Sequence, residues 1–391
     1  MRRIPLRAVA AACIVAAGFC FVAGIFIVGL TDKNASDRDF IQYWAAAKQL
    51  IHGANPYDPA AILQLERSAG LDSFHPKVTY SPPVAFFLVW PLGLVSAKTG
   101  LVAWLLILIG CLSASVWILW LLNGRPSNRL HLFGYVFAPA LACLMAGQLG
   151  IFLLLGFLLF LYLYRLHPFL SGAVLLPCAL KPHLFLPFAL VLLLWVVRRK
   201  AYGILVGFLT SLMASCALSL YLDAQVWRQY SQMMRTTGVL QAWVPTLSVS
   251  LRFLVARNQV WVQLVPEAAV CVWAFWFFLT RRERWSWMHE GLLLLLVSAA
   301  CTPYAWFSDE CILLPAVLAG LYRAADSRRL LVLFGLISGV ALIEVLGSVQ
   351  LTSPYYLWTT PAWLAWYLVA TGNKKKSADE IGPAQRLKAT E

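Results

Sequence analysis

Apolar runs long enough to cross a membrane, separated by short clusters of basic residues, recur along almost the whole chain. A transmembrane helix needs about 20 consecutive apolar residues. Of the 391 residues, 61% are hydrophobic and 12% are charged, and the mean hydropathy is +0.74. Soluble domains carry about 25% charged residues, so this composition excludes a soluble globular fold, and it excludes disorder for the same reason. We expect one polytopic bundle of membrane helices.

The chain carries 31 Lys and Arg against 17 Asp and Glu, which gives a net charge of +14. The basic residues lie between apolar runs, and the positive-inside rule of membrane proteins produces this distribution. We therefore expect membrane lipids around the protein and no nucleic acid as a partner. The nine cysteines lie almost all inside apolar runs and form no CxxC pair, which indicates small buried residues rather than disulfides or a zinc site.

The first apolar run, 8–30, follows three arginines near the N-terminus. It is longer than the apolar core of a signal peptide, which has about 7–15 residues, so we expect an uncleaved first helix with a cytoplasmic N-terminus. The segment 31–97 would then be a long extracytoplasmic loop with interfacial helices. Its apolar run 82–95 has about 14 residues, which favours an interfacial segment over a span. A span at 82–95 would also place most basic clusters outside.

Further spans are expected at about 98–122, 131–147, 150–165, 169–181, 183–197, 201–222, 262–280, 290–307, 311–325, 330–349 and 355–371. Basic clusters such as 198–200 and 374–376 meet the ends that this topology places inside. The sequence therefore predicts an all-α polytopic protein with about 12 transmembrane helices, both termini in the cytoplasm, and one transmembrane domain over 1–372. The basic segment 373–391 is expected to be a disordered cytoplasmic tail.

The first loop contains the strongest candidate for chemistry. Phe40, Tyr43, Trp44 and Ala47 recur at helical spacing, which predicts a helix that lies on the bilayer surface. Asp39 stands at the N-terminal end of this helix, where a carboxylate meets the membrane face. We take Asp39 as the catalytic candidate and include Tyr43 as a further candidate site residue.

Asp37 forms an Asp-x-Asp pair with Asp39. Two carboxylates can hold a divalent cation together with substrate phosphates, so the pair invites a metal interpretation. The alternative for Ser36 or Asp37 is an N-cap of the following helix. A nucleotide substrate is not expected outside the cell. We therefore expect no cofactor and no obligatory metal. The pair still allows binding of a divalent ion.

A second candidate is Lys181-Pro182-His183, which lies between two apolar runs. A cation at this position is costly unless it meets water, a lipid headgroup or an anion. One interpretation is that Lys181 extends to the membrane interface with its charged end in water. The other is a phosphate contact by the Lys181 ammonium, with His183 as a second donor.

Polar residues near the outer ends of other spans complete the candidate set. Tyr304 and Asp309 lie at the end of one expected span, Gln148 marks another turn, and Glu344 is the acid placed most deeply in an apolar run. The alternatives are a solvated turn for Asp309 with Glu310 and a structural hydrogen bond for Glu344. On the expected topology, all these candidates fall in the outer half of the bundle together with those of the first loop, which indicates one site.

Five motifs follow one another along most of the chain, roughly 10–370. They are DFIQYWAAAKQLIHGANPYDP, YSPPVAFFLVWPLGLVS, GQLGIFLLLGFLL, ALKPHLFLPFALVLLLW and TPYAWFSDECILLPA. Their order and spacing resemble glycosyltransferase family 87, whose members have the GT-C membrane fold. The chain departs from the family where it reads Pro245-Thr246-Leu247-Ser248 instead of Asn-Gln-Ser-Leu. It also lacks a histidine that some mannosyltransferase members have near the position of Asp309.

The resemblance implies transfer of a hexose, typically mannose, from a polyprenyl-phosphate sugar to an extracytoplasmic glycolipid or polysaccharide at the outer face of the plasma (inner) membrane. It implies an acidic general base in the first outer loop, at the position of Asp39, and it places the lysine of the family's Leu-Lys-Pro motif on Lys181. A single displacement would invert the anomeric carbon. The alternatives are a polytopic transporter or lipid flippase that uses Glu344 and broken helices, and a non-catalytic membrane scaffold.

Overall fold

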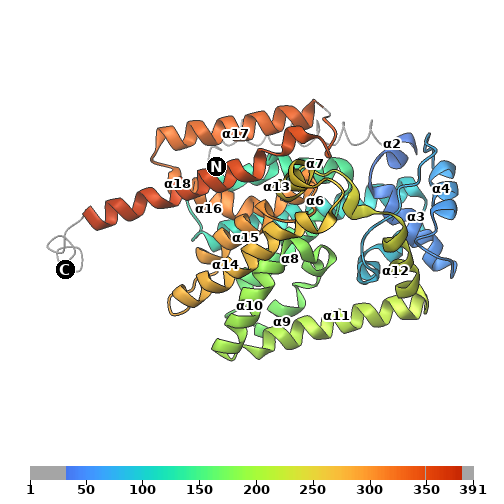
Figure 1. The fold of residues 1–391 in the computed structure, drawn as a ribbon, viewed down its shortest axis with the longest axis horizontal. Coiled ribbons are helices and arrows are strands. Elements are labelled where there is room, and N and C mark those ends of the chain that lie inside the picture. The colour runs from blue at the N-terminus through green and yellow to red at the C-terminus, as the bar shows by residue number, and fades with distance from the viewer. Residues whose placement is uncertain (1–31, 348, 381–391) are drawn as a thin grey trace, which may run out of the picture. The chain divides into compact units, whose positions relative to one another are not determined.

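The computed structural model describes residues 32–347 and 349–380, and every regular element within them is an α- or 3₁₀-helix (Figure 1). The expected all-α class is therefore confirmed for these residues. Two compact units divide the chain: Met1–Thr79 with Leu88–Leu105, and Tyr80–Phe87 with Leu106–Glu391. The expected first span, 8–30, lies outside the described residues.

The first unit is built from short helices and the beginning of a long one. Its elements are α2 (Asp32–Asp37), α3 (Phe40–Ile51), α4 (Pro59–Ser68), η2 (Trp90–Leu94) and the start of α6 (Ala97–Leu122). Helix α3 therefore forms where the apolar spacing predicts a helix.

The apolar face of α3 is buried inside the first unit. Tyr43 and Trp44 are almost fully buried, and Trp44 Nε1 donates a hydrogen bond to the Val95 carbonyl at 3.0 Å. One turn further along, Lys48 Nζ donates to the Gly93 carbonyl at 3.0 Å. This face of α3 therefore packs on the segment around η2. The location of α3 at the bilayer surface stays a prediction.

The apolar run 82–95 forms three short helices: η1 (Pro83–Ala85), α5 (Phe86–Val89) and η2. A proline occupies one of the first two positions of η1 and of η2, where its missing N–H costs no helical hydrogen bond. The run therefore turns repeatedly instead of forming one helix of spanning length.

Helix α5 is divided between the two units, and the second unit contains the rest of α6 together with the elements named next. They are η1, η3 (Leu130–Tyr135), α7 (Ala138–Ala146), α8 (Gly150–Leu163), α9 (Pro168–Ala173), η4 (Leu176–Leu180), η5 (Pro182–Leu184), α10 (Leu186–Arg199), α11 (Tyr202–Leu222), α12 (Val226–Thr236), η6 (Val239–Gln241), α13 (Leu247–Val255), η7 (Val260–Leu264), α14 (Val265–Arg281), α15 (Glu290–Ala300), η8 (Phe307–Leu313), α16 (Leu314–Ala324), α17 (Arg328–Leu346), η9 (Pro354–Tyr356) and α18 (Thr359–Glu380). Helix α18 runs through 373–380, which the sequence analysis assigned to a disordered tail.

Four helices among the described residues are long and apolar enough to cross a membrane. They are Ala97–Leu122, Tyr202–Leu222, Val260–Arg281 and Arg328–Leu346. Five other apolar segments have 10–17 residues each. Expected spans such as 131–147 and 169–181 are divided between an α-helix and a 3₁₀-helix, so the apolar runs of the sequence are longer than the regular helices they form.

Two breaks in these apolar runs matter for the site. Lys181 lies between η4 and η5 with φ −134° and ψ 68°, because a residue before proline avoids the helical region. The expected span 290–307 ends early: α15 stops at Ala300, and 301–306 carry no helix before η8 begins. Pro303 in this stretch cannot donate a helical hydrogen bond. Both breaks bring non-helical backbone and polar side chains into an apolar surrounding.

Close packing fixes these breaks in place. Helix α9 lies against α11 (Figure 1) so tightly that a Cβ on Gly172 would lie 1.8 Å from the Ile204 carbonyl oxygen. At the other break, the Phe307 ring stacks on the Tyr356 ring with centroids 4.1 Å apart. These two rings join a buried cluster with residues of α7 and α17, so η8 has one defined position in the second unit.

Candidate active site

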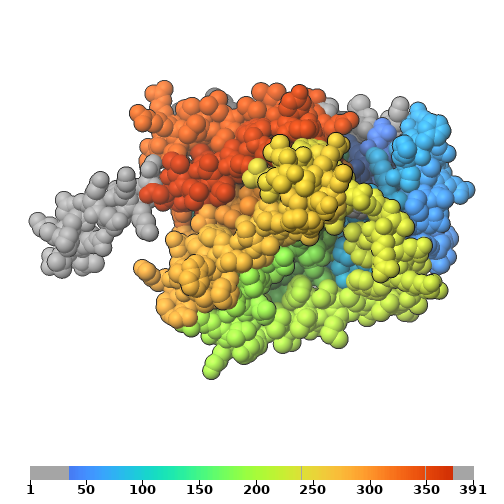
Figure 2. Space-filling model, viewed as in Figure 1, coloured from blue at the N-terminus to red at the C-terminus, as the bar shows by residue number. Residues whose placement is uncertain are grey.

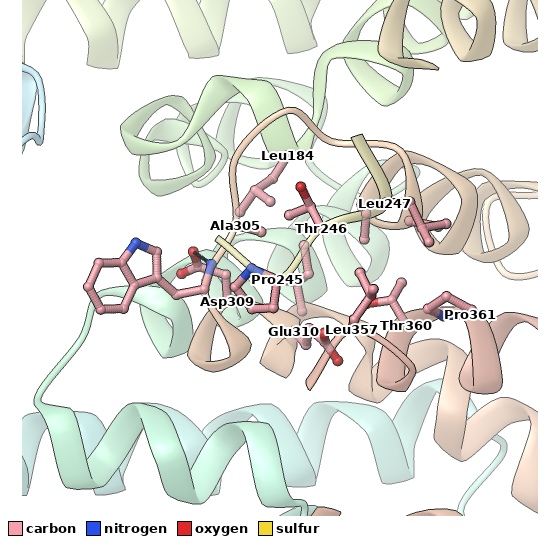
Figure 3. Close-up of a pocket in the computed structure, with 14 residues that line it drawn as sticks. Leu184, Pro245, Thr246, Leu247, Ala305, Asp309, Glu310, Leu357, Thr360 and Pro361 are labelled. Carbon is pink, nitrogen blue, oxygen red and sulfur yellow. Dashed lines mark hydrogen bonds between the residues drawn. The ribbon is translucent and has the colours of Figure 1, made fainter. Parts of the chain in front are cut away.

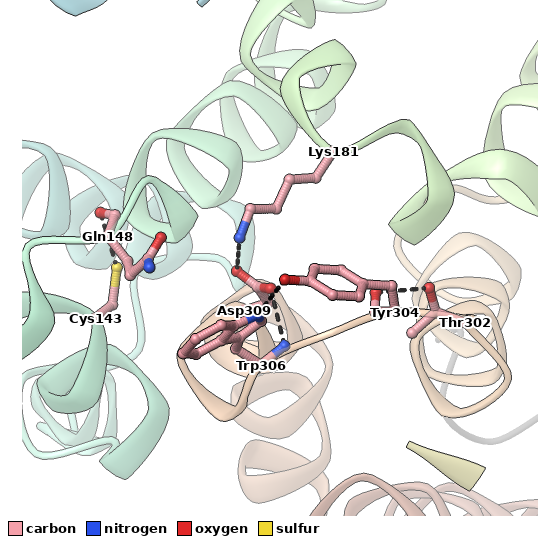
Figure 4. A network of polar contacts seen from close by, with 7 residues as sticks. All are labelled: Cys143, Gln148, Lys181, Thr302, Tyr304, Trp306 and Asp309. Carbon is pink, nitrogen blue, oxygen red and sulfur yellow. Dashed lines mark hydrogen bonds and ion pairs between the residues drawn. The ribbon is translucent and has the colours of Figure 1, made fainter. Parts of the chain in front are cut away.

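A buried ion pair joins the two breaks. Lys181 Nζ lies 2.6 Å from Asp309 Oδ1, and the two side chains are 12% and 0% exposed (Figure 4). The ammonium of Lys181 therefore does not extend into water alone, and Asp309 is not part of a solvated turn, whereas the phosphate contact of Lys181 stays a prediction. A charge in so dry a place requires a partner, and each residue supplies it to the other.

The carboxylate of Asp309 is held from both sides. Its Oδ2 accepts a hydrogen bond from the Trp306 backbone N–H at 3.1 Å, at the beginning of η8, while Oδ1 faces Lys181. A carboxylate with both oxygens engaged has little freedom to rotate. Asp309 therefore sets the direction of the Lys181 side chain.

Aromatic side chains surround this pair. Trp306 Nε1 donates to Tyr304 Oη at 2.5 Å, and the His183 ring meets the Tyr304 ring edge-on with centroids 5.6 Å apart. Thr302 Oγ1 lies 3.2 Å from both the His183 and the Tyr304 carbonyl oxygens. The candidates Lys181, His183, Tyr304 and Asp309, predicted from segments far apart in the sequence, thus form one network.

The His183 imidazole lies against Tyr304 in this network. Its Nε2 is buried without a hydrogen-bond partner among the described residues. His183 can therefore offer a hydrogen bond from one ring nitrogen.

Gln148 lies in the short turn between α7 and α8 and is buried. Its backbone carbonyl accepts from Cys143 Sγ at 3.2 Å (Figure 4). The grouping of Gln148 with the other candidates stays a prediction.

Glu310 is a buried acid, which the sequence analysis placed with Asp309 either in a solvated turn or in the lining of a cavity. Its Oε1 accepts from Thr359 Oγ1 at 2.6 Å. Burial raises its pKa to about 8; hydrogen bonds from Thr359 and Thr360 lower it, and the charges of Asp309 and Glu344 raise it. In the sequence, the adjacent threonines Thr359 and Thr360 at the beginning of α18 are the feature that could have indicated this contact.

A small cavity of about 10 Å³ adjoins Glu310 and Asp309 (Figure 3). Leu184, Thr246 and Thr360 are among the residues that line it. This is the size that holds one water molecule. The cavity therefore lies against both acids but is too small for a sugar.

Glu344 lies in α17, and its Oε1 accepts from Trp358 Nε1 at 3.4 Å. The structural hydrogen bond that the sequence analysis left as an alternative is therefore present. Glu344 Oε2 is buried and has no partner among the described residues.

The remaining candidates belong to the first unit. Asp37 ends α2 and is exposed, and Asp39 occupies the N-cap position of α3, half-buried, without a side-chain hydrogen bond to that helix. The sequence analysis considered Ser36 or Asp37 as the N-cap of this helix. In the structure, Asp39 occupies the N-cap position. Tyr43 is a core residue, since its ring packs 5.9 Å from the Trp104 ring.

Two residues that the sequence analysis did not single out hold the turn between α2 and α3. Lys77 Nζ donates to the Asp37 carbonyl at 2.6 Å, and the Lys77 backbone N–H donates to Glu66 Oε2 at 3.0 Å. Glu66 is fully buried, and burial raises its pKa to about 6, against the lowering effect of Lys77. This anchor fixes the backbone that carries Asp39.

In the described part of the chain, no group of three or more His, Cys, Asp or Glu side chains is arranged to hold a metal ion. Asp37 and Asp39 would have to bind a divalent ion with ligands from a substrate.

The fold and the buried cation define a class of protein: an all-helical membrane protein with a polar site enclosed among apolar helices. The model of glycosyltransferase family 87 matches residues 79–303, more than half of the chain, and the protein belongs to this family of membrane glycosyltransferases. The match includes Gln148, Lys181 and His183 and lies between Asp39 and Asp309 in the sequence. No curated protein and no solved structure matches the chain.

Proposed function

We propose that the protein transfers a hexose, mannose by preference, from a polyprenyl-phosphate sugar to a glycolipid or polysaccharide acceptor. The observation that carries this proposal is the buried Lys181 ammonium, held by Asp309 at a break between apolar helices. A lipid-linked donor reaches such a place through the membrane and needs no nucleotide-binding domain. Membership in a glycosyltransferase family supplies the reaction class.

Lys181 stabilises the leaving phosphate. Its ammonium has three N–H donors, of which Asp309 uses one in the structure, so the others can bind phosphate oxygens. Charge develops on the phosphate as the bond to the sugar breaks, and a preoriented cation in a dry site stabilises that charge more than water does. His183 adds one hydrogen bond.

Asp39 is the general base. Its carboxylate takes the proton of the acceptor hydroxyl, the hydroxyl oxygen attacks the anomeric carbon, and the bond from that carbon to the phosphate oxygen breaks with its electron pair on the phosphate. One displacement of this kind inverts the anomeric carbon. No cofactor is required, because the cation that balances the phosphate is a side chain; a divalent ion at Asp37 and Asp39 is not obligatory.

The proposed topology places this reaction on the extracytoplasmic side of the plasma membrane. About 12 spans in a GT-C arrangement, with one transmembrane domain over 1–372 and both termini in the cytoplasm, put Lys181 and Asp39 at the same leaflet. The basic clusters between apolar runs support this orientation. Introduced cysteines at exposed positions near Asp39 and Lys181, labelled in intact cells, would contradict the topology if only one of them reacted.

The decisive experiment measures transfer from radiolabelled polyprenyl-phosphate mannose to a membrane glycolipid extract by purified protein in lipid nanodiscs. Asp39→Asn is expected to lower kcat by at least about 100-fold, because general base catalysis contributes that much. Asp72→Asn, an exposed aspartate in the same segment, is the matched control and keeps full activity. Equal activity of Asp39→Asn and wild type would refute the role of Asp39, and absence of transfer from every polyprenyl-phosphate sugar would refute the function.

A further inference from the structure

A groove opens in the second unit beside the C-terminal end of α17. It is a largely open groove of about 520 Å³. Glu344 from α17, Leu247 from α13, and Tyr355 and Trp358 around η9 are among the lining residues. Figure 2 shows the yellow residues of α13 next to the red residues of the C-terminal segment at this place.

This groove leads toward the ion pair. Leu247, Leu357 and Pro361 line both the groove and the water-sized cavity that contains Asp309 and Glu310 (Figure 3). The groove and the cavity therefore share these three side chains as a common wall.

One carboxylate oxygen of the groove lacks a partner. Glu344 Oε2 is buried and has no hydrogen-bond partner among the described residues, while Oε1 accepts from Trp358 Nε1. Buried polar atoms are normally hydrogen-bonded, so Glu344 Oε2 indicates a hydrogen-bond donor that occupies this place when the protein works.

The lining selects the chemistry of that donor. Carboxylates accept hydrogen bonds and repel anions, which excludes a phosphate group as the preferred ligand. The Trp358 and Tyr355 rings offer flat apolar faces on which the C–H face of a sugar ring can pack. Carboxylates beside aromatic rings therefore suit a neutral polyhydroxylated ring.

An apolar surface continues from the groove along α17. Ile343 and Leu346, next to Glu344 in the sequence, are 72% and 65% exposed. In a membrane this surface meets lipid, so a ligand with its polar ring in the groove can extend an alkyl chain along α17. The whole arrangement fits a glycolipid rather than a free sugar.

We propose that this groove binds the neutral sugar headgroup of the glycolipid acceptor, with Glu344 as the residue that accepts its hydroxyl hydrogens and Trp358 and Tyr355 as the surface under its ring. The identification of this glycolipid as the acceptor of the reaction rests on the proposed function. The recognition of a neutral glycolipid headgroup rests on the groove alone.

Equilibrium binding of radiolabelled decyl mannoside to the full chain in phosphatidylcholine nanodiscs tests the groove without turnover. Wild type is expected to bind this probe, and Glu344→Gln is expected to bind it at least about tenfold more weakly, the loss of a hydrogen bond to a charged group. Glu283→Gln, an exposed glutamate after α14, is the matched control and binds as wild type does. Equal affinity of Glu344→Gln and wild type would overturn the proposal.

A purely structural role of Glu344 is distinguished by a second pair of measurements. Tyr355 is 70% exposed, so Tyr355→Ala tests the groove without disturbing α17, and it is expected to weaken the probe several-fold with an unchanged Tm. Decanediol and phosphatidylglycerol are expected not to displace the mannoside. Displacement by either at equal concentration would show that the site recognises an alkyl chain or an anion, and the proposal would fail.

Transfer kinetics separate this inference from the proposed function. Glu344→Gln is expected to raise KM for the glycolipid acceptor and to leave KM for the polyprenyl-phosphate donor unchanged, and Lys181→Gln is expected to do the opposite. If wild type shows no transfer but the mannoside binds in a Glu344-dependent way, the proposed function fails and the groove stands. If transfer occurs and Glu344→Gln changes neither the KM for the acceptor nor the affinity for the mannoside, the proposed groove is refuted and the proposed function is supported.

Discussion

Replacing Asp309 by asparagine leaves the Lys181 ammonium buried without its carboxylate partner. Removing one member of a buried ion pair costs about 3–5 kcal/mol, because an uncompensated charge remains in the interior. The Lys181 side chain is 12% exposed, so partial hydration of the ammonium lowers this free-energy cost. We therefore expect a loss of about 3 kcal/mol in the free energy of unfolding. The asparagine oxygen can still accept from the Trp306 backbone N–H, so the beginning of η8 is preserved.

The double variant Lys181→Met with Asp309→Asn separates stability from activity. It removes both charges and keeps the volume of the side chains, and such replacements are often neutral or stabilising. We expect it to regain the stability of wild type to within about 1 kcal/mol and to remain inactive in sugar transfer. Unfolding in mixed micelles at increasing denaturant measures the free energies.

The exposed pair between Arg198 and Glu283 supplies the control. Glu283→Gln should cost less than about 1 kcal/mol, as exposed ion pairs do. The reasoning is refuted if Asp309→Asn is as stable as wild type, or if the double variant is destabilised by the sum of its two single changes. Recovery of transfer activity in the double variant would refute the role of Lys181 in binding phosphate.

Other features of the structure lead to predictions with simple measurements. Because burial raises the pKa of Glu66 to about 6, the folded state binds a proton that the unfolded state releases near the usual pKa of 4.5. Stability should therefore fall as pH rises from 4.5 to 6, by at most about 2 kcal/mol, and Glu66→Gln should flatten this dependence in thermal unfolding scans. Gly172→Ala would place a Cβ 1.8 Å from the Ile204 carbonyl oxygen, so a loss of several °C in Tm is expected. Gly110→Ala meets no atom within 4 Å and should leave Tm unchanged or raise it; equal Tm values for the two variants would contradict the packing of α9 against α11.

The helices that the sequence predicts well are those whose apolar runs carry no proline. The expected spans 98–122, 201–222 and 330–349 agree with α6, α11 and α17 to within three residues at each end. The sequence predicts the break at Pro182, which lies between two expected spans, but not the one at Pro303. An apolar run indicates that a segment is buried, but it does not determine the backbone hydrogen bonds of that segment. Likewise, the spacing of Tyr43 and Trp44 predicts the helix α3 but cannot tell a protein neighbour from lipid, since both are apolar.

The site was accessible to sequence reasoning only in part. A lysine among apolar residues is costly enough to mark Lys181 as a candidate without any partner in view. Its partner is 128 residues away, and no local pattern connects them, so Asp309 could be assigned to a turn. The contact of Glu310 with Thr359 and the anchoring of the α2–α3 turn by Lys77 depend in the same way on packing between distant segments.

The fixed carboxylate of Asp309 has a consequence for how a reaction cycle would end. A polyprenyl-phosphate sugar is a phosphodiester with one negative charge, whereas the lipid phosphate left after transfer is a monoester that carries close to two at neutral pH. On the proposed function, the Lys181 ammonium would attract this spent lipid more strongly than the fresh donor, and the fixed carboxylate of Asp309 would offset part of that attraction by repelling it. The residue that orients the ammonium would thus also limit how tightly the product is retained.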